Sequence, residues 1–352
     1  MSIVEQLQRQ HLKQLTPYAS ARRSMSGGNI WLNANESPYS NSFTVDDSKL
    51  NRYPEFQSKP LNQAYAEYAG VESSQVLSSR GSDEGIELLI RAFCEPGQDK
   101  VLICPPTYGM YAISAKTFAV GVNEVPLLKS WQLDTESVID AAAESKVIFL
   151  CSPSNPLGNR LNPDDIEQVL QHSPSSIVVV DEAYIEFSSG NSVAGWLRRY
   201  PNLVVLRTLS KAFALAGIRC GFLLANDDII ELLQKVLAPY PLPDPTVQIA
   251  VQALQTSSLE RLQQQVASLL AERDRVQTAL EQTPLTLVSE SDTNFLLYQC
   301  EDAAGLVKSL ADNGLLIRNQ SAQQGLENVV RITIGSAAEN DELIQQLKDY
   351  FS

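Results

Sequence analysis

The sequence predicts an α/β fold with two parts, a large domain with a mostly parallel sheet flanked by helices and a smaller α+β domain. Between about residues 61 and 237, short apolar runs rich in β-branched residues alternate with segments of helical periodicity, which is typical of βα units. Beyond a proline-rich segment at 239–245, strand-like and helix-like segments alternate over a shorter range. With 352 residues, 44% of them hydrophobic, the chain is long enough for two domains with a large buried core.

The elements of the large domain follow from its apolar runs. Seven strands are expected, at 75–78, 100–104, 122–126, 146–151, 176–181, 203–207 and 220–224. Helices are expected in the gaps, one of them from Glu84 to Phe93. The run 177–180 contains only isoleucine and valine, so it predicts a strand buried on both faces, as in a parallel sheet.

The rest of the chain divides at the prolines. Because the segment 239–245 cannot continue a helix, it separates the large domain, 44–245, from a second region, 246–352. That region opens with an amphipathic stretch at 247–281, which predicts one or two interdomain helices. The C-terminal small domain then has expected strands at 294–298, 315–318 and 329–334 and expected helices at 303–312 and 340–351. At the other end, one helical stripe is formed by Ile3, Val4, Leu7, Leu12 and Leu15.

The composition limits the class of protein. A net charge of −14 repels nucleic acid and anionic membrane surfaces. No apolar run reaches the roughly 18 residues of a membrane span, and the first residues lack a signal-peptide pattern, so a cytoplasmic protein is expected. The five cysteines are scattered without metal-type spacing, which predicts reduced thiols. Both histidines lie in polar surroundings, so histidine triads and metal sites are not expected.

The segment 207–221 joins a reactive amine to anion-binding groups. Ser210 and Lys211 follow an expected strand, and Arg219 comes shortly after them. Lys211 suits a Schiff base with the aldehyde of pyridoxal 5′-phosphate, whose phosphate Ser210 and Arg219 would hold. Taken alone, this lysine is better explained as a solvated residue in a surface turn, because most lysines are solvated.

Two further expected strands end in polar side chains. Asp181 closes one strand and is followed by Tyr184, and Asn155 lies in a proline-rich turn after another. Open α/β sheets bind ligands at the carboxyl ends of their strands. There an aspartate can keep a pyridine nitrogen protonated, and a tyrosine can donate a hydrogen bond to the ring phenolate. In isolation, Asp181 also suits a strand cap and Asn155 ordinary turn chemistry.

Taken in this order, the three segments resemble fold-type I pyridoxal-phosphate enzymes, the aspartate aminotransferase superfamily. Shorter motifs resemble its histidinol-phosphate aminotransferase family, at 16–18, 32–36, 51–54, 80–86, 105–111 and 331–335. The resemblance covers essentially the whole chain, and it implies that residues 1–43 form an N-terminal arm and part of the small domain. One departure lies in the proline turn, where Ser154 and Leu157 stand where the family often has asparagine and threonine. Asn155 itself matches the family.

The resemblance implies a role for each site residue. Lys211, Asp181 and Tyr184 would be catalytic. The cofactor would also be held by Ser82, Asp83, Tyr108, Asn155, Ser210 and Arg219, with Tyr108 stacked on its ring. Tyr53 matches a tyrosine that reaches the cofactor phosphate of the neighbouring subunit, so a homodimer with a shared active site is expected. Arg331, with Arg318 and Tyr18, would bind the substrate. On chemistry alone, Ser82 and Asp83 suit helix capping equally well, and Tyr111 is expected to pack.

The implied activity is the interconversion of L-histidinol phosphate and 2-oxoglutarate with imidazole acetol phosphate and L-glutamate, a ping-pong step of histidine biosynthesis. A planar guanidinium such as that of Arg331 binds carboxylate and phosphate alike, so one pocket can serve both substrates. A lyase similar to threonine-phosphate decarboxylase would share almost every site residue and stays open as an alternative. A cofactor-binding regulator with weakened catalysis is disfavoured by the intact set of Lys211, Asp181 and Tyr184.

Overall fold

A seven-stranded sheet forms the centre of the larger part of the molecule. The computed structural model describes residues 2–16, 27–188, 190 and 192–352. The sheet order is β2-β8-β7-β6-β5-β3-β4. The strands are β2 (Val76–Ser79), β3 (Lys100–Ile103), β4 (Gly121–Glu124), β5 (Val147–Cys151), β6 (Ile177–Asp181), β7 (Leu203–Thr208) and β8 (Gly221–Ala225). Strands β4, β3, β5, β6 and β7 run parallel to one another, and β8 is antiparallel to both of its neighbours, β7 and β2. The expected mostly parallel sheet is confirmed.

Both faces of the central strands are buried. Along β6, Val178 and Val180 belong to one hydrophobic cluster and Val179 to another. Since neighbouring side chains of a strand point to opposite faces, these two clusters are the two sides of the sheet. The continuous run of β-branched residues in β6 thus supplies both layers of the core, as the sequence predicts.

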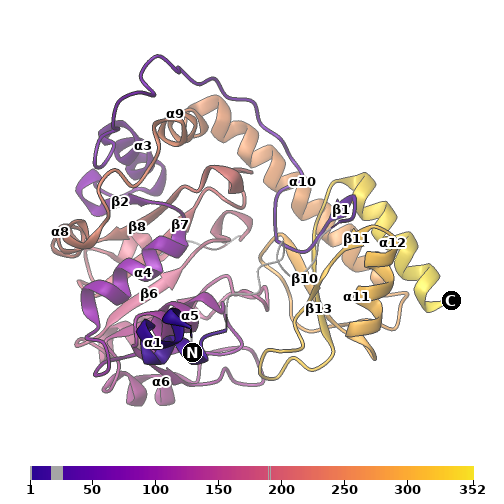
Figure 1. The fold of residues 1–352 in the computed structure, drawn as a ribbon. Helices are drawn as coiled ribbons and strands as arrows, with labels where there is room; N and C mark the ends of the chain where they lie inside the picture. The colour runs from indigo at the N-terminus through magenta and orange to yellow at the C-terminus, as the bar shows by residue number, and fades with distance from the viewer. Residues whose placement is uncertain (1, 17–26, 189, 191) are drawn as a thin grey trace.

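Helices cover both faces (Figure 1). On one side pack α3 (Lys59–Ala69), α6 (Thr135–Ala142) and α7 (Pro163–His172), and on the other α4 (Ser82–Phe93), α5 (Met110–Thr117) and α8 (Asp227–Val236). Helix α4 starts after Gly81 and carries Asp83 and Glu84 in its first turn and Arg91 in its last. These charges oppose the helix dipole at each end and favour the helix.

The smaller part has a four-stranded antiparallel sheet in the order β12-β13-β10-β9. Its strands are β9 (Thr286–Leu287), β10 (Phe295–Gln299), β12 (Arg318–Asn319) and β13 (Val329–Thr333). The single strand expected at 315–318 is wrong, because the chain changes partners at Ile317. Before this residue, β11 (Leu315–Leu316) pairs in parallel with β1 (Ile30–Trp31), and after it β12 pairs with β13.

The bounds of the helices in this part agree closely with those predicted from the sequence. Helix α11 spans Ala303–Asp312 as predicted. Helix α12 (Ala337–Phe351) starts three residues before the predicted 340, because Ser336 and Glu339 form a capping box. The amphipathic stretch forms two helices, α9 (Asp244–Ala253) and α10 (Thr256–Leu280). Figure 1 shows α10 running from the large sheet towards α11 and α12.

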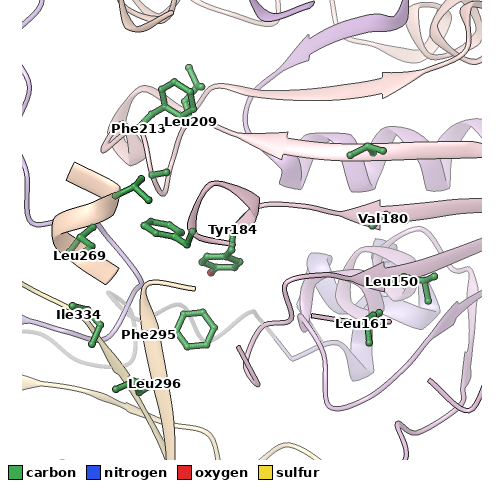
Figure 2. Close-up of a cluster of buried hydrophobic side chains, with 14 of the residues drawn as sticks. Leu150, Leu161, Val180, Tyr184, Leu209, Phe213, Leu269, Phe295, Leu296 and Ile334 are labelled. Atoms are coloured by element: carbon green, nitrogen blue, oxygen red, sulfur yellow. The ribbon is translucent and has the colours of Figure 1, made fainter. Parts of the chain in front are cut away.

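The two sheets share one hydrophobic cluster. It contains Val180 of β6 and Ile334, which follows β13. Figure 2 shows Tyr184, from the loop after β6, beside Phe295 of β10. The two rings meet edge to face, with centroids 5.3 Å apart. Tyr184 is therefore fixed by packing against the smaller part of the molecule.

The first residues lie elsewhere than expected. They form α1 (Ile3–Leu7) and a 3₁₀ helix, η1 (Gln10–Gln14), beside α5 rather than beside the smaller part (Figure 1). His11 Nε2 lies 3.1 Å from the carbonyl oxygen of Thr117, the last residue of α5. In the next described segment, Asn29 and β1 lie against the smaller part. Of the predicted apolar stripe, Ile3, Val4 and Leu7 are exposed, with Leu7 76% accessible, whereas Leu12 and Leu15 are half-buried.

Candidate active site

Three adjacent strands deliver the polar residues of the site. In the sheet register, Asp181 of β6 lies between Cys151 of β5 and Leu206 of β7. Because these strands are parallel, the segments that follow them leave the sheet at the same edge. Asn155 follows β5, Tyr184 follows β6, and Lys211 follows β7.

A cavity of about 330 Å³ opens at this edge. Eleven of the predicted site residues line it: Ser82, Asp83, Tyr108, Asn155, Asp181, Tyr184, Ser210, Lys211, Arg219, Arg318 and Arg331. The structure thus brings together residues from both sheets and from α4. In contrast, Arg207, which opens the segment that contains Lys211, points away and forms a buried ion pair with Glu182, Nε to Oε2 2.9 Å.

The amine of Lys211 is prepared to react near neutral pH. Its Nζ donates a hydrogen bond to the carbonyl oxygen of Ala34 at 3.0 Å. Burial lowers the pKa of Lys211 to about 8, and the positive charge of Arg331 adds to this effect. Arg219 also lowers this pKa, but its effect is smaller than that of Arg331.

Asp181 is 3% exposed and is held by two donors. Its Oδ1 accepts from the backbone N–H of Ala183 at 3.2 Å, and its Oδ2 accepts from the hydroxyl of Tyr111 at 2.7 Å. Burial raises the pKa of Asp181 to about 6, and the hydrogen bond from Tyr111 opposes that rise. Tyr111 packs as expected, stacked on Phe149, but its hydrogen bond to Asp181 was not predicted.

The hydroxyl of Tyr184 also lines the cavity and accepts a hydrogen bond from Asn35 Nδ2 at 2.9 Å. Burial raises its pKa. Asn35 belongs to the segment that follows β1, so a residue of the N-terminal region orients this phenol. The phenol can in turn donate its proton to an anionic oxygen in the cavity.

The N-terminus of α4 faces the cavity with Ser82 and Asp83. The N-cap position is Gly81, so these two residues lie in the first turn and do not cap the helix. Asp83 instead accepts from the Tyr108 hydroxyl at 2.9 Å and from Arg219 Nη2 at 3.2 Å. The carboxylate thereby orients an aromatic ring and a cation towards one space. Helix N–H groups and Arg219 together form an anion site.

Two glycines make this anion site possible. Gly81 has φ +80, and a Cβ there would lie 2.7 Å from Arg219 Nη2. A Cβ on Gly221, at the start of β8, would lie 2.5 Å from the carbonyl carbon of Gly81 and 2.6 Å from the nitrogen of Ser82. The start of α4 can approach the sheet this closely only where the strand has no side chain.

A second group of cations comes from the smaller sheet. Arg318 and Arg331 are directly opposite each other in the β12–β13 pair, and both line the cavity. Like charges at opposed positions destabilise a sheet, and a bound anion offsets that repulsion. Arg331 is 7% exposed and donates to Asn155 Oδ1 at 2.6 Å and to the carbonyl oxygen of Asn33 at 3.1 Å.

Two predicted residues remain. Tyr18 lies outside the residues that the structure describes, and Tyr53 does not line the cavity. Tyr53 is 83% exposed, and its ring stacks on Tyr240 at 4.7 Å. It contributes nothing to the cavity of its own chain.

Several lining residues had no predicted role: Asn33, Ala34, Asn35, Glu36, Cys151, Thr208, Gln320 and Gln323. In the sequence, the segment 33–36 stands out only as part of the family motif at 32–36. The signal available in the sequence was a cluster of polar residues directly after an apolar pair, Trp31 and Leu32. Nothing local in the sequence indicates that this segment crosses to the edge of a sheet formed far along the chain.

The lining suits pyridoxal 5′-phosphate. The α4 N-terminus, Ser82, Ser210 and Arg219 supply donors for a phosphate, Asp181 supplies a buried carboxylate for a ring nitrogen, and Lys211 supplies the amine. Within the described ranges, no group of three metal-ligating side chains occurs. No helix in the described part of the chain is long and apolar enough to cross a bilayer.

Comparison with known proteins points to one family. The family model for aminotransferase class I and II matches residues 28–347. Histidinol-phosphate aminotransferase 2 of Idiomarina loihiensis is 93% identical over all of both chains, and histidinol-phosphate aminotransferase of Escherichia coli is 49% identical over 98% of both. The crystal structure of histidinol-phosphate aminotransferase from Sinorhizobium meliloti with pyridoxal-5′-phosphate has the same fold. Its TM-score is 0.85 at 22% identity, covering 97% of this chain and 96% of that one.

The close approach of Gly221 to α4 predicts the effect of adding one methyl group. In Gly221→Ala, the new Cβ pushes the start of α4 away from the sheet. We expect the affinity for pyridoxal phosphate to fall by at least about tenfold and the free energy of unfolding to fall by about 1–3 kcal/mol. Cofactor titration and denaturant unfolding measure the two effects. Gly217→Ala is the matched control, because a Cβ there meets no atom within 4 Å. Equal behaviour of the two variants would contradict the prediction.

The lowered pKa of Lys211 predicts how its reaction with the cofactor depends on pH. Only the neutral amine attacks an aldehyde, so the rate of covalent attachment to cofactor-free protein should rise with pH through about 8 and level off above it. Arg331→Met removes a charge that lowers this pKa, so the midpoint should move to higher pH. Arg198→Met is the control, because this arginine is 79% exposed in a surface ion pair. A wild-type midpoint near the ordinary lysine value would refute the assignment.

Proposed function

Because the chain belongs to the class I and II aminotransferases and, among them, to the histidinol-phosphate aminotransferase family, we propose that it interconverts L-histidinol phosphate and 2-oxoglutarate with imidazole acetol phosphate and L-glutamate. This reaction is a step of histidine biosynthesis, and its cofactor is pyridoxal 5′-phosphate. The observation that carries the substrate assignment is the opposed pair Arg318 and Arg331 in a cavity that already has one anion site at α4. The second site suits the anionic group of the substrate.

Each side chain has a task in this proposal. When bound, pyridoxal phosphate supplies an aldehyde for the substrate amine and a ring that accepts electron density from the substrate carbon. Asp181 would keep a proton on the ring nitrogen, and Tyr184 and Asn155 would hydrogen-bond the ring oxygen. The Nζ of Lys211, with its pKa of about 8, takes the proton from the amino-bearing carbon of the substrate.

The arginines account for the use of two different substrates. Arg331 lies in a fixed position through Asn155 and Asn33, so its planar guanidinium is already oriented for a bidentate anion. Histidinol phosphate presents a phosphate and glutamate a carboxylate, and a guanidinium binds either. Tyr18 is proposed as a further phosphate contact. Arg318 from β12 adds the second charge that a phosphate dianion needs.

We further propose a cytoplasmic homodimer in which Tyr53 completes the partner's site. The exposed pair Tyr53 and Tyr240 supports this, because a large aromatic surface outside its own cavity suits an interface. We also propose that the large domain spans 44–245 and that the flanking regions 1–43 and 246–352 form the arm, the interdomain helices and the small domain.

The substrate is tested with the cofactor-loaded protein. With L-histidinol phosphate and 2-oxoglutarate, glutamate should form, and the half-reaction with histidinol phosphate alone should convert the cofactor to its amine form. L-threonine phosphate should release no carbon dioxide. Carbon dioxide from threonine phosphate without glutamate from histidinol phosphate would favour the lyase instead.

The shared site is tested by complementation. Co-expression of a Tyr53→Ala chain with a Lys211→Ala chain gives hybrid dimers in which one of two sites has both residues. If half of the dimers are hybrids, about a quarter of the wild-type activity per protomer is expected at limiting cofactor. Each variant expressed alone should stay well below that value. No recovery, or a monomer in sedimentation analysis, would exclude the shared site.

A further inference from the structure

Tyr111 lies beneath the cavity with its ring immobilised. The ring is fully buried and parallel to Phe149 of β5, with centroids 4.7 Å apart and planes at 5°. On its other side it meets Tyr108 edge to face at 5.6 Å. These ring contacts hold the hydroxyl beside Asp181 and the Cys151 thiol, and it donates to Asp181 Oδ2 at 2.7 Å.

The second oxygen of Asp181 has its own donor, the backbone N–H of Ala183. The two donors come from different elements, α5 and the loop after β6. Together they fix the plane of the carboxylate. A short hydrogen bond to a carboxylate is charge-assisted, so it favours the ionised over the protonated form.

We propose that Tyr111 is a positioning residue that keeps Asp181 ionised and oriented towards the pyridine nitrogen of the cofactor. The phenol does not touch the cofactor in this role, and it acts only through Asp181. The inference rests on the pyridoxal-phosphate site described above. The inference does not depend on which compounds donate and accept the amino group.

The electrostatics around Asp181 show why such a donor is needed. Burial is the largest effect that raises the pKa of Asp181, and the charges of Asp83 from α4 and Glu182 act in the same direction, so that this pKa lies at about 6. The Cys151 thiol from β5 and the Tyr184 phenol also face this carboxylate. The hydrogen bond from Tyr111 is the largest opposing effect. Without it, the pKa moves up towards neutral pH, and a protonated Asp181 cannot pair with a protonated ring nitrogen.

The test is the affinity of cofactor-free protein for pyridoxal phosphate as a function of pH. Tyr111→Phe keeps both ring contacts and removes only the donor. We expect the dissociation constant near pH 7 to rise by about tenfold or more, and the fall in affinity on the acid side to begin about one pH unit higher than in the wild type. Tyr65→Phe is the matched control, since Tyr65 is also fully buried and stacked on a phenylalanine, Phe222.

A double-variant cycle separates positioning from simple packing. In an Asp181→Asn background the charge is absent, so Tyr111→Phe should change the affinity by less than about twofold. An equal loss in both backgrounds, an equal loss in Tyr65→Phe, or an unchanged acid limb would overturn the proposal.

A second route applies if Tyr111→Phe does not fold. 3-Fluorotyrosine at position 111 keeps the ring and makes the hydroxyl a stronger donor, so the acid limb should move to lower pH. An acid limb that stays in place would also overturn the proposal. Because these measurements use no amino-acid substrate, a failure of the substrate assignment leaves their result unaffected.

Discussion

The register of three parallel strands is the constraint on which the site depends. Cys151, Asp181 and Leu206 lie side by side in β5, β6 and β7. The segments that carry Asn155, Tyr184 and Lys211 therefore leave the sheet at adjacent positions of the same edge. The hydrogen bonds of the sheet and the two buried core layers fix these positions. The polar groups can therefore be placed accurately although they lie on loops.

Successive side chains along a strand point in opposite directions, so the adjacent acids Asp181 and Glu182 have different partners. Asp181 points into the cavity, whereas Glu182 points away and accepts from Arg207, Ser192 Oγ and the N–H of Val193. This buried, satisfied carboxylate ties the loop after β6 to β7. The same loop carries Tyr184, so an ion pair outside the cavity contributes to the position of a residue inside it.

The sequence predicts well whatever is local. Apolar runs predict the seven strands of the large sheet to within two residues, and polar residues at strand ends predict Asp181 and Lys211 as neighbours. Contacts between segments that are far apart in the sequence cannot be predicted from local patterns. Periodicity assigns Tyr111 to a buried face, but its hydroxyl meets a residue 70 positions away. Likewise, the opposed positions of Arg318 and Arg331 depend on a change of partner at Ile317 that hydropathy does not mark.

Arg331 connects the smaller sheet with the large part of the molecule and with the N-terminal region. It extends from β13 and joins Asn155 of the large part to Asn33 of the N-terminal region, and its charge lowers the pKa of Lys211. An anion bound to Arg331 would partly neutralise that charge and raise the pKa of the amine. Anion binding at the small sheet is thus coupled to the basicity of the lysine by electrostatics alone. The amine would then be a stronger base when the anionic group of a substrate is in place, which is when a proton has to be taken up.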